Sequence, residues 1–328
     1  MKRTGVVVVT HNSGDVIGSC LDSIAAYCPD AQVVVVDNAS EDGTVDAASR
    51  QGVRSISNQR NRGFAEAVNQ GVLALDCDTV IVLNPDVELM SALDGLVTAL
   101  QDGQAGIAGG KLLDAEGNPQ TGFAVRRFPT PWTLAFEVLG LNRLAPWNPV
   151  NRRYRCLDLD LDRPADVDQP PGAMLAFRRD LWERLGGFDA VFHPVWFEDV
   201  DFCKRARGLG VRIRYIPEVV AWHRGGHSIQ KVRWCCREVY WYASLLRYAS
   251  KHFQTIGCSG VSLAVVLGSI FRSVTGLVQR RSLRPIRVYG QVLGMAARCM
   301  FYGRVDQRVC LAGYEQGSGV GTVTSAKE

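Results

Sequence analysis

The sequence lacks the cysteine pattern of a disulfide or zinc framework. Its ten cysteines include no C-x-x-C pair and follow no regular spacing, so we interpret them as reduced, mostly buried thiols. The sequence has no internal repeat either. A short stretch rich in Gly, Ser and Thr runs from Gly317 to Ser325, and we expect a disordered tail over residues 311–328.

Long apolar runs are also missing. Near the N-terminus, Val6–Val9 is too short for the core of an export signal, so we expect a cytoplasmic protein. The longest candidate, Ile256–Phe271, stops at Arg272 after sixteen residues, whereas a helix needs roughly twenty to span a bilayer. We expect an interfacial amphipathic segment here, with a soluble core helix or a true span as alternatives.

Acidic residues are scarce in one part of the chain. Residues 204–308 hold 3 Asp or Glu against 19 Lys or Arg, whereas residues 1–203 hold 28 against 17. Such a basic region predicts an anionic partner: a membrane surface, a phosphorylated substrate or nucleic acid. No nucleic-acid-binding motif accompanies this region, so we do not expect nucleic acid as a partner. Four arginines directly follow the apolar segment and favour contact with anionic headgroups: Arg280, Arg281, Arg284 and Arg287.

Short apolar runs alternate with helical segments in the first hundred residues. The runs of strand length are Val6–Val9, Val33–Val36 and Val80–Leu83, with Val53–Ser57 as a weaker candidate. Apolar residues recur at helical spacing in Asp15–Tyr27, Gly43–Gln51 and Ala65–Leu75. This alternation predicts a doubly wound, Rossmann-like α/β fold with a mostly parallel sheet.

Polar residues follow three of these strands, where such a sheet binds its ligands. They are Thr10-His11-Asn12-Ser13, Asp37-Asn38-Ala39-Ser40 and Asn84-Pro85-Asp86. No G-x-G-x-x-G follows the first strand, which argues against an NAD-dependent oxidoreductase. A sugar nucleotidylyltransferase would need a Gly-rich loop with Lys or Arg at the same place, and that loop is also absent.

The pattern becomes irregular between Pro119 and Pro171, where Pro, Trp and Arg are frequent. We interpret this region as long loops and short helices that line an acceptor site. Further along, the pattern predicts strands at Met174–Phe177 and Val211–Ile216 and a helix at Asp180–Leu185. Residues 229–253 are aromatic and basic, with helical character.

Four segments together resemble the family 2 glycosyltransferases. They are Val-Val-Thr-His-Asn-Ser (8–13), Val-Asp-Asn-Ala-Ser-Glu-Asp-Gly-Thr (36–44), Asn-Arg-Gly-Phe-Ala-Glu-Ala-Val-Asn-Gln-Gly (61–71) and Leu-Asn-Pro-Asp (83–86). The resemblance spans residues 4–230 and is closest to the rhamnosyltransferase-like branch that builds bacterial cell-wall and surface polysaccharides. It implies a GT-A domain over 1–230, with a nucleotide-sugar-binding half (1–115) and an acceptor or catalytic half (116–230). We expect a helical, basic, membrane-associating region over 231–310.

The resemblance assigns donor-binding roles to residues of the first half. Asp37 would accept a hydrogen bond from the base of the donor, with Thr10 and Asn12 beside it; the alternative is an Asp that only caps its loop. Asn61 and Gly63 would support donor binding at a helix N-terminus. A plain turn that starts a helix is the alternative there.

The resemblance also implies a divalent metal, Mg²⁺ or Mn²⁺. Many relatives carry Asp-x-Asp where this chain has Asn84-Pro85-Asp86, so the metal role passes to Asp86 alone, with His223 and the donor diphosphate as further ligands. Mg²⁺ is compatible with so few protein ligands because it keeps several waters and binds substrate phosphates. The alternatives are an Asp86 that caps a helix starting near Ser91 and a purely structural His223.

The catalytic centre is expected in Glu198-Asp199-x-Asp201, which Trp196 and Phe197 precede. Aromatic neighbours would desolvate a carboxylate and raise its pKa towards that of a general base. The resemblance makes Asp199 the base, and Glu198 would orient the acceptor; Asp201 could be a helix cap. Arg224 and His227, also donor-binding residues, would neutralise the leaving diphosphate. The role of 169–173, either flanking the sugars or a rigid turn, stays open.

These assignments predict an inverting, metal-dependent glycosyltransferase at the inner face of the cell membrane. Its donor would be a nucleotide sugar, first dTDP-rhamnose or else a UDP-sugar, and its acceptor a polyprenyl-diphosphate-linked saccharide or polysaccharide. Another transferred sugar (galactose, glucose, GlcNAc or mannose) is an alternative. So is a catalytically silent scaffold of a polysaccharide-assembly complex, which the missing carboxylate at position 84 favours. The sequence does not predict the oligomeric state.

Overall fold

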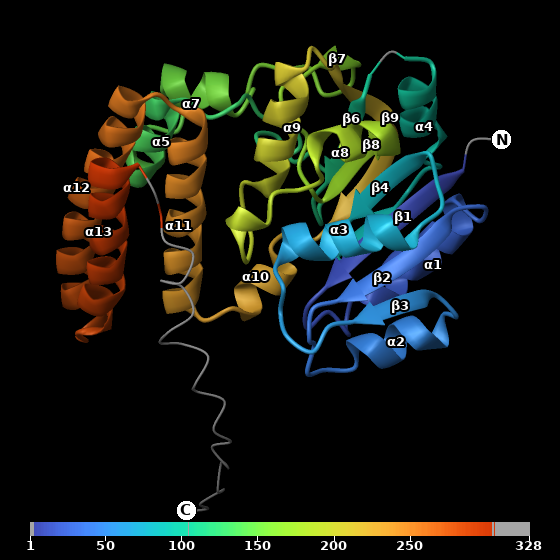
Figure 1. The fold of residues 1–328 in the computed structure, drawn as a ribbon, viewed down its shortest axis with the longest axis horizontal. Helices are drawn as coiled ribbons and strands as arrows, with labels where there is room; N and C mark the ends of the chain where they lie inside the picture. Colours follow the sequence, from blue (N-terminus) through green and yellow to red (C-terminus); the bar gives the residue numbers. More distant parts are fainter. Residues whose placement is uncertain (1–2, 104, 304, 306–328) are drawn as a thin grey trace, which may run out of the picture.

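The computed structural model describes residues 3–103, 105–303 and 305. It contains a mixed sheet with helices on both faces and, beside it, a bundle of long C-terminal helices (Figure 1). The expected disordered tail, 311–328, and the end of the expected helical region, 306–310, lie outside the described residues.

The first four strands form the parallel half of the sheet, in the order β3-β2-β1-β4. They are β1 (Thr4–Thr10), β2 (Gln32–Asp37), β3 (Arg54–Ser57) and β4 (Thr79–Leu83). Runs of β-branched residues form these strands because both faces of the sheet are covered. The register pairs Thr10 with Asp37, so the polar residues that follow β1 and β2 meet at one edge.

The other half of the sheet is mixed. Strand β8 (Met174–Arg178) runs antiparallel between β4 and β6 (Ile107–Leu113). Beyond β6 lie β9 (Ile213–His223), parallel to it, and the short antiparallel strands β5 (Val87–Leu89) and β7 (Ala165–Asp166), which both pair with β9. The expected α/β fold with a mostly parallel sheet is confirmed.

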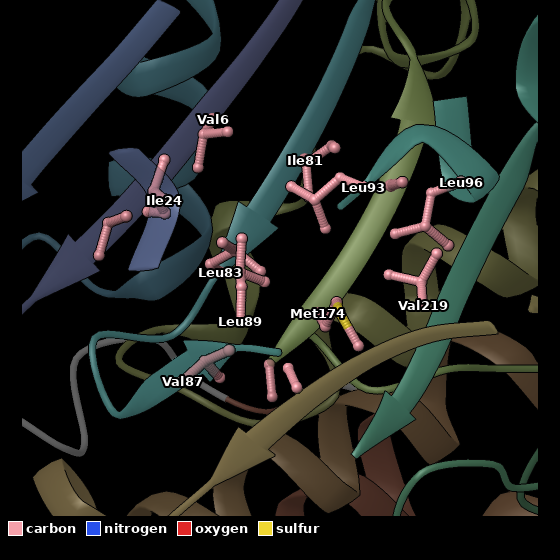
Figure 2. Close-up of a cluster of buried hydrophobic side chains, with 14 of the residues drawn as sticks. Val6, Ile24, Ile81, Leu83, Val87, Leu89, Leu93, Leu96, Met174 and Val219 are labelled. Atoms are coloured by element: carbon pink, nitrogen blue, oxygen red, sulfur yellow. The ribbon is translucent and has the colours of Figure 1, made fainter. Parts of the chain in front are cut away.

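Helices cover each face of the sheet and form a separate core there. Val6 and Val8 face α1 (Ile17–Tyr27), α2 (Thr44–Arg50) and α4 (Asp94–Gln101), in the core of Figure 2. Val7 and Val9 face the other way, towards α3 (Phe64–Ala74), α8 (Arg179–Leu185) and α9 (Glu198–Gly208). Successive valines of β1 serve both cores because side chains alternate along a strand.

Strand β9 is longer than its sequence predicts. The sequence predicts a strand over Val211–Ile216, whereas β9 begins at Ile213 and does not end before Pro217, although a proline cannot donate a ladder hydrogen bond. The strand instead passes Pro217 through a bulge: Gly110 pairs with Ile216, but the next residue, Lys111, pairs with Val220. The bulge accommodates the proline, and the strand continues to His223.

Short helices occupy the irregular region, as expected. They are α5 (Pro131–Val138), α6 (Leu141–Leu144) and α7 (Pro149–Tyr154); further on come the 3₁₀ turn η1 (Ala190–Phe192) and α10 (His227–Lys231). Thr130 and Asn148 cap α5 and α7 by accepting backbone hydrogen bonds, and a proline follows each of them. A cap followed by proline is a strong helix start.

Three long helices end the described chain: α11 (Trp234–His252), α12 (Thr255–Arg280) and α13 (Arg284–Tyr302). They form a third core with α5 and with Phe192 and Phe197. Helix α12 corrects our expectation that its apolar segment ends at Arg272. That side chain donates to the carbonyl of Val138 on α5, and the helix continues past it to Arg280. By length and composition alone, Thr255–Gln279 could cross a membrane, with mean hydropathy 1.8 and 33% of its most apolar window buried.

Candidate functional site

Asp86 and His223 lie next to each other although they are far apart in the sequence. Strand β5, directly after Asp86, pairs antiparallel with the end of β9, so Val87 lies opposite His223. The His223 Nε2 and Asp86 Oδ1 atoms are 3.7 Å apart, and both side chains are buried. The alternative of Asp86 as a helix cap is wrong, because β5 intervenes and α4 begins only at Asp94.

Gln120 fixes the orientation of the His223 ring. Its amide Nε2 donates to the His223 carbonyl at 2.7 Å, which leaves its Oε1 to accept from His223 Nδ1 at 3.0 Å. Phe123 stacks on the ring, with centroids 5.3 Å apart. Burial lowers the pKa of His223, although the charge of Asp86 opposes this shift. Since Gln120 Oε1 can only accept, Nδ1 carries the proton of the neutral ring, and the Nε2 lone pair then lies on the side of Asp86.

These two residues fit a divalent metal. His223 Nε2 is buried and has no hydrogen-bond partner among the described residues, and its other ring nitrogen donates to an oxygen, as metal-binding histidines usually do. In the part of the chain that the structure describes, no group of three or more His, Cys, Asp and Glu could hold a metal. A metal here would thus need ligands from substrate and water.

The loops after β1 and β2 are joined by Asp37, which is only 2% exposed. Its Oδ1 accepts from Thr10 Oγ1 at 2.9 Å and from the Ser40 hydroxyl, and its Oδ2 accepts from the Ser40 backbone N–H. Asn12 links the same loops, because its side-chain oxygen accepts from the N–H of Glu41. The structure therefore shows Asp37 in the loop-capping arrangement that the sequence left as an alternative.

Asn61 and Gly63 form a tight turn at the start of α3. The Asn61 side chain accepts from the Gly63 N–H at 2.8 Å, and Asn38 donates to the Gly63 carbonyl at 3.2 Å. Gly63 has φ +84° and ψ 163°, a combination almost restricted to glycine. The turn also contacts the segment before α9, because the Phe64 N–H donates to the Pro194 carbonyl at 2.8 Å.

Glu198 and Asp199 begin helix α9. The two residues before them, Trp196 and Phe197, both have positive φ, 79° and 72°, so this helix start is held in a strained conformation. Asp199 Oδ2 accepts from the Gly172 N–H at 2.8 Å. Asp201 is not the cap that we considered. It lies inside the first turn, and Phe197 occupies the cap position.

Segment 169–173, whose role the sequence left open, connects Asp199 to residues 84–86, which we call the Asp86 loop. Gly172 contacts Asp199, as above, and the next residue, Ala173, accepts from the Asn84 N–H at 3.0 Å. Strand β8 follows this segment and pairs with β4. The antiparallel strand therefore brings Asp199 and the Asp86 loop to the same edge of the sheet.

The Glu198 side chain is buried, and Asp199 beside it is half-buried. Burial, and then the charge of Asp199, raise the pKa of Glu198 well above its usual value. Its Oε2 has no hydrogen-bond partner in the described part of the chain. Burial also raises the pKa of Asp199, against the backbone N–H groups of Gly172 and Val200 and the charge of Arg126. A raised pKa suits a group that takes up a proton near neutral pH.

Helix α10 is bound to the loop after β1 through Asp15. His227 Nε2 and Lys231 Nζ each lie 2.9 Å from its carboxylate, and Arg224 lies 3.8 Å away. The hydrogen bond from Lys231 is the main cause that lowers the pKa of Asp15, to about 2. Sequence reasoning missed Asp15, Lys231 and Gln120. Only Lys231 carries a signal, since it lies one helical turn after His227.

The model of glycosyl transferase family 2 matches residues 5–185, which is more than half of the chain. The chain belongs to this family. Among its relatives is the low-salt glycan biosynthesis hexosyltransferase Agl10 of Haloferax volcanii, 26% identical over 66% of this chain and 66% of its own length. The pre-mycofactocin glycosyltransferase of Mycobacterium tuberculosis is 31% identical over 46% of this chain. Rhamnosyltransferase WbbL of Escherichia coli is 24% identical over 76% of this chain and 97% of its own length.

The chain spans just under two thirds of the Haloferax relative and one third of the mycobacterial one. Among solved structures, the mannosyltransferase PcManGT of Pyrobaculum calidifontis, in complex with GDP-Man and Mn²⁺, has a TM-score of 0.52 at 20% identity. That alignment covers 92% of this chain and 88% of that one. GalNAc-T7 with UDP, GalNAc and Mn²⁺ also has a TM-score of 0.52, at 15% identity, over 76% of this chain and 50% of its own. These likenesses support the GT-A fold that the sequence predicted.

Proposed function

We propose that this family 2 protein is an inverting, metal-dependent glycosyltransferase that uses a nucleotide-diphosphate sugar. One observation carries the proposal: the Asp86–His223 pair and the Glu198–Asp199 pair meet at one edge of the sheet, joined by Gly172 and Ala173. The first pair offers ligands to a metal that also binds a diphosphate. The second offers a desolvated base beside it.

In this mechanism Asp199 accepts the proton of an acceptor hydroxyl, whose oxygen attacks the anomeric carbon of the donor. The bond between that carbon and the diphosphate oxygen breaks, and the nucleoside diphosphate leaves with the electron pair. A single displacement of this kind inverts the anomeric configuration. Mg²⁺ or Mn²⁺ bound by Asp86 and His223 would supply a Lewis acid for the diphosphate.

Arg224 and His227 would take part once α10 is released from Asp15. In the present conformation both side chains contact that carboxylate. The carboxylate is an anion, so it takes the place that the donor diphosphate would take beside them. Exchange of Asp15 for the donor diphosphate would bring their charge to the leaving group, where it stabilises the transition state. Thr10, Asn12, Asp37, Asn61 and Gly63 would shape the donor pocket beside them.

For the transferred sugar we propose rhamnose from dTDP-rhamnose, in the synthesis of a cell-wall or surface glycan. WbbL, named a rhamnosyltransferase, aligns over almost its whole length. The names of two other similar proteins do not point to rhamnose: Agl10 is named only as a hexosyltransferase, and PcManGT as a mannosyltransferase. A UDP-sugar or GDP-mannose is therefore the competing donor, and a polyprenyl-diphosphate-linked saccharide is the proposed acceptor.

The C-terminal helices would hold the protein at an anionic membrane surface. We call the solvent-facing side of α12 its outer face; it comprises Ile256, Leu263, Leu267, Ile270, Phe271, Val274 and Val278, between 50% and 89% exposed. These residues recur at helical spacing and form one apolar stripe. Arg281, Arg284 and Arg287, just beyond its end, are exposed as well. An apolar stripe next to arginines fits the boundary between acyl chains and anionic headgroups.

Donor turnover tests the catalytic proposal. The protein is incubated with Mn²⁺, a lipid-linked acceptor and, in turn, dTDP-rhamnose, UDP-glucose, UDP-galactose, UDP-GlcNAc and GDP-mannose, and nucleoside diphosphate release is measured. We expect release from one donor, and its loss in Asp199→Asn and Asp86→Ala variants that still unfold cooperatively. Absence of both turnover and nucleotide binding would instead support the scaffold alternative, which the Asn at position 84 favours.

Vesicle flotation tests the membrane proposal separately. We expect the full chain to float with vesicles that contain phosphatidylglycerol and to remain behind with pure phosphatidylcholine. Phe271→Asp and Val278→Asp place charges on the outer face without touching the buried core, and they should abolish flotation. Trp132→Asp, at another exposed aromatic residue, is the matched control. Equal flotation of all variants would contradict the assignment of the outer face.

A further inference from the structure

One side of helix α11 contacts the segment that leads into the catalytic carboxylates, residues 189–197. Ser244 Oγ donates to the Val195 carbonyl at 2.9 Å, and Arg247 Nη1 donates to the His193 carbonyl at 2.8 Å. Both side chains are buried. One turn further along the helix, Lys251 Nζ donates to Asp189 Oδ2 at 2.6 Å. The spacing places all three on the same side of the helix.

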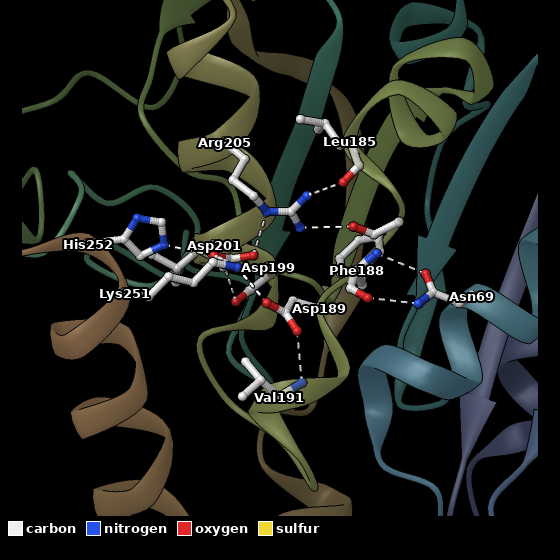
Figure 3. Close-up of polar contacts among 12 residues, drawn as sticks. Asn69, Leu185, Phe188, Asp189, Val191, Asp199, Asp201, Arg205, Lys251 and His252 are labelled. Carbon is white, nitrogen blue, oxygen red and sulfur yellow. Dashed lines mark hydrogen bonds and ion pairs between the residues drawn. The ribbon is translucent and has the colours of Figure 1, made fainter. Parts of the chain in front are cut away.

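The same side of α11 also contacts Asp201, inside α9. His252 Nε2 and Lys251 Nζ lie 2.7 Å and 2.8 Å from its Oδ1, and Arg205 Nε donates to its Oδ2 at 2.7 Å. Figure 3 shows Lys251 and His252 on one side of Asp201 and Arg205 on the other. The Asp201 side chain is fully buried, so these partners determine how the first turn of α9 is held.

The segment 189–197 needs such external support. Trp196 and Phe197 lie in the left-handed region, which costs of order 1–3 kcal/mol for each residue and persists only where surrounding contacts enforce it. Phe197 packs against Tyr248 of α11, with ring centroids 5.2 Å apart. On its other side the segment contacts the turn that Asn61 and Gly63 form, which we call the donor turn: the Pro194 carbonyl accepts from the Phe64 N–H, directly after this turn. It thus lies between α11 and the donor turn.

We propose that α11 is a positioning element of the transfer reaction, in addition to its place in the C-terminal bundle. Through Lys251 and His252 on Asp201, and through Ser244 and Arg247 on the strained segment, it holds Glu198 and Asp199 in register with the donor turn. This inference rests on the proposed function. It makes the C-terminal region part of the catalytic apparatus, as well as a candidate membrane contact.

The test removes both α11 donors to Asp201 in the full chain, by Lys251→Met together with His252→Phe. Arg205 still pairs with Asp201, so no buried charge is left alone. We expect kcat to fall roughly tenfold to a hundredfold, as for a misplaced catalytic group, while UDP or dTDP binding with Mn²⁺ stays within about twofold. The conservative pair Lys251→Arg and His252→Gln restores donors and should recover kcat.

Glu238→Gln is the matched control. Glu238 lies on α11 but accepts from the Tyr289 hydroxyl of α13 at 3.0 Å, so this change perturbs the bundle without touching the segment. A kcat of the double variant within about twofold of the wild type would overturn the proposal. So would an equal loss in Glu238→Gln, or loss of nucleotide binding together with kcat.

Hydrogen exchange distinguishes failure of this inference from failure of the proposed function. Mass spectrometry should show faster amide exchange in residues 189–199 of the double variant, and unchanged exchange there in Glu238→Gln. That result does not depend on turnover. A wild type that neither turns over a donor nor binds its nucleotide would refute the proposed function; an unaltered exchange rate in 189–199 would refute the role of α11.

Discussion

The substitution Gly63→Ala tests how tightly the donor turn packs against His193 and Pro194, in the segment that precedes Glu198. A Cβ at this position would lie 2.7 Å from His193 Nδ1 and 3.1 Å from the Pro194 carbonyl. The imidazole cannot simply move away, because its Nδ1 already contacts the Arg62 carbonyl at 3.1 Å. The change therefore meets two obstacles, a backbone conformation that favours glycine and a steric clash.

The two costs can be separated with Gly52→Ala. Gly52 also has positive φ, +69°, but a Cβ there would meet no other described residue within 4 Å. It should lose about 1–2 kcal/mol of unfolding free energy through left-handed strain alone. Gly63→Ala should lose about 1–3 kcal/mol through its backbone and about 1–3 kcal/mol more through overpacking. The gain from a stiffer unfolded chain is common to both and cancels in the comparison.

The assay is urea unfolding followed by tryptophan fluorescence, with both variants measured beside the wild type. We expect Gly63→Ala to be the less stable variant by at least about 1 kcal/mol, the lower bound for overpacking. Because the clash pushes on the segment before Glu198, its kcat should fall too, whereas Gly52→Ala should keep its activity. Equal stability of the two variants would refute this account of the contact.

Three further predictions concern charged and polar groups of the site. Asp15→Asn frees Arg224 and His227 from their carboxylate partner and should tighten UDP binding roughly two- to fivefold, measured by calorimetry; unchanged or weaker binding would contradict the exchange of partners. Gln120→Leu removes the group that orients His223 and should weaken Mn²⁺ affinity about 10- to 100-fold, followed by paramagnetic resonance; equal affinity would count against the metal site. Burial raises the pKa of Glu198, so the folded protein keeps a proton there that the unfolded chain has lost, and stability falls as pH rises above the ordinary pKa of Glu. Glu198→Gln cannot ionise and should lose less urea resistance than the wild type between pH 5 and pH 8; parallel pH curves would refute this.

The parallel half of the sheet could be predicted because its signals are local. The valine runs of β1 and β2 and the helical spacing between them report burial on both faces. The polar residues that follow these strands then meet for a geometric reason, since parallel strands end at one edge. The lengths of β9 and α12 could not be predicted. Pro217 and Arg272 normally interrupt such elements, and only tertiary contacts show that here they do not.

The residues of the candidate site could be predicted from the sequence, but their arrangement in space could not. The resemblance named Asp86, His223 and Asp199, but their proximity depends on two antiparallel pairings, β5 with β9 and β4 with β8. Strand order of this kind leaves no mark in local periodicity. The partners of Asp15 and Asp201 are similarly remote in sequence. These polar contacts join segments that come together only when the whole domain has folded.

The bulge at Pro217 has a consequence for how this protein can change in evolution. Downstream of the bulge, β9 alternates inward and outward residues up to its last one, His223. Loss or gain of a single residue between 217 and 222 would turn every later side chain to the opposite face. Trp222 or Arg224 would then lie beside Asp86 in place of the imidazole. The short stretch after the bulge should therefore tolerate substitutions at its exposed positions but no insertion or deletion.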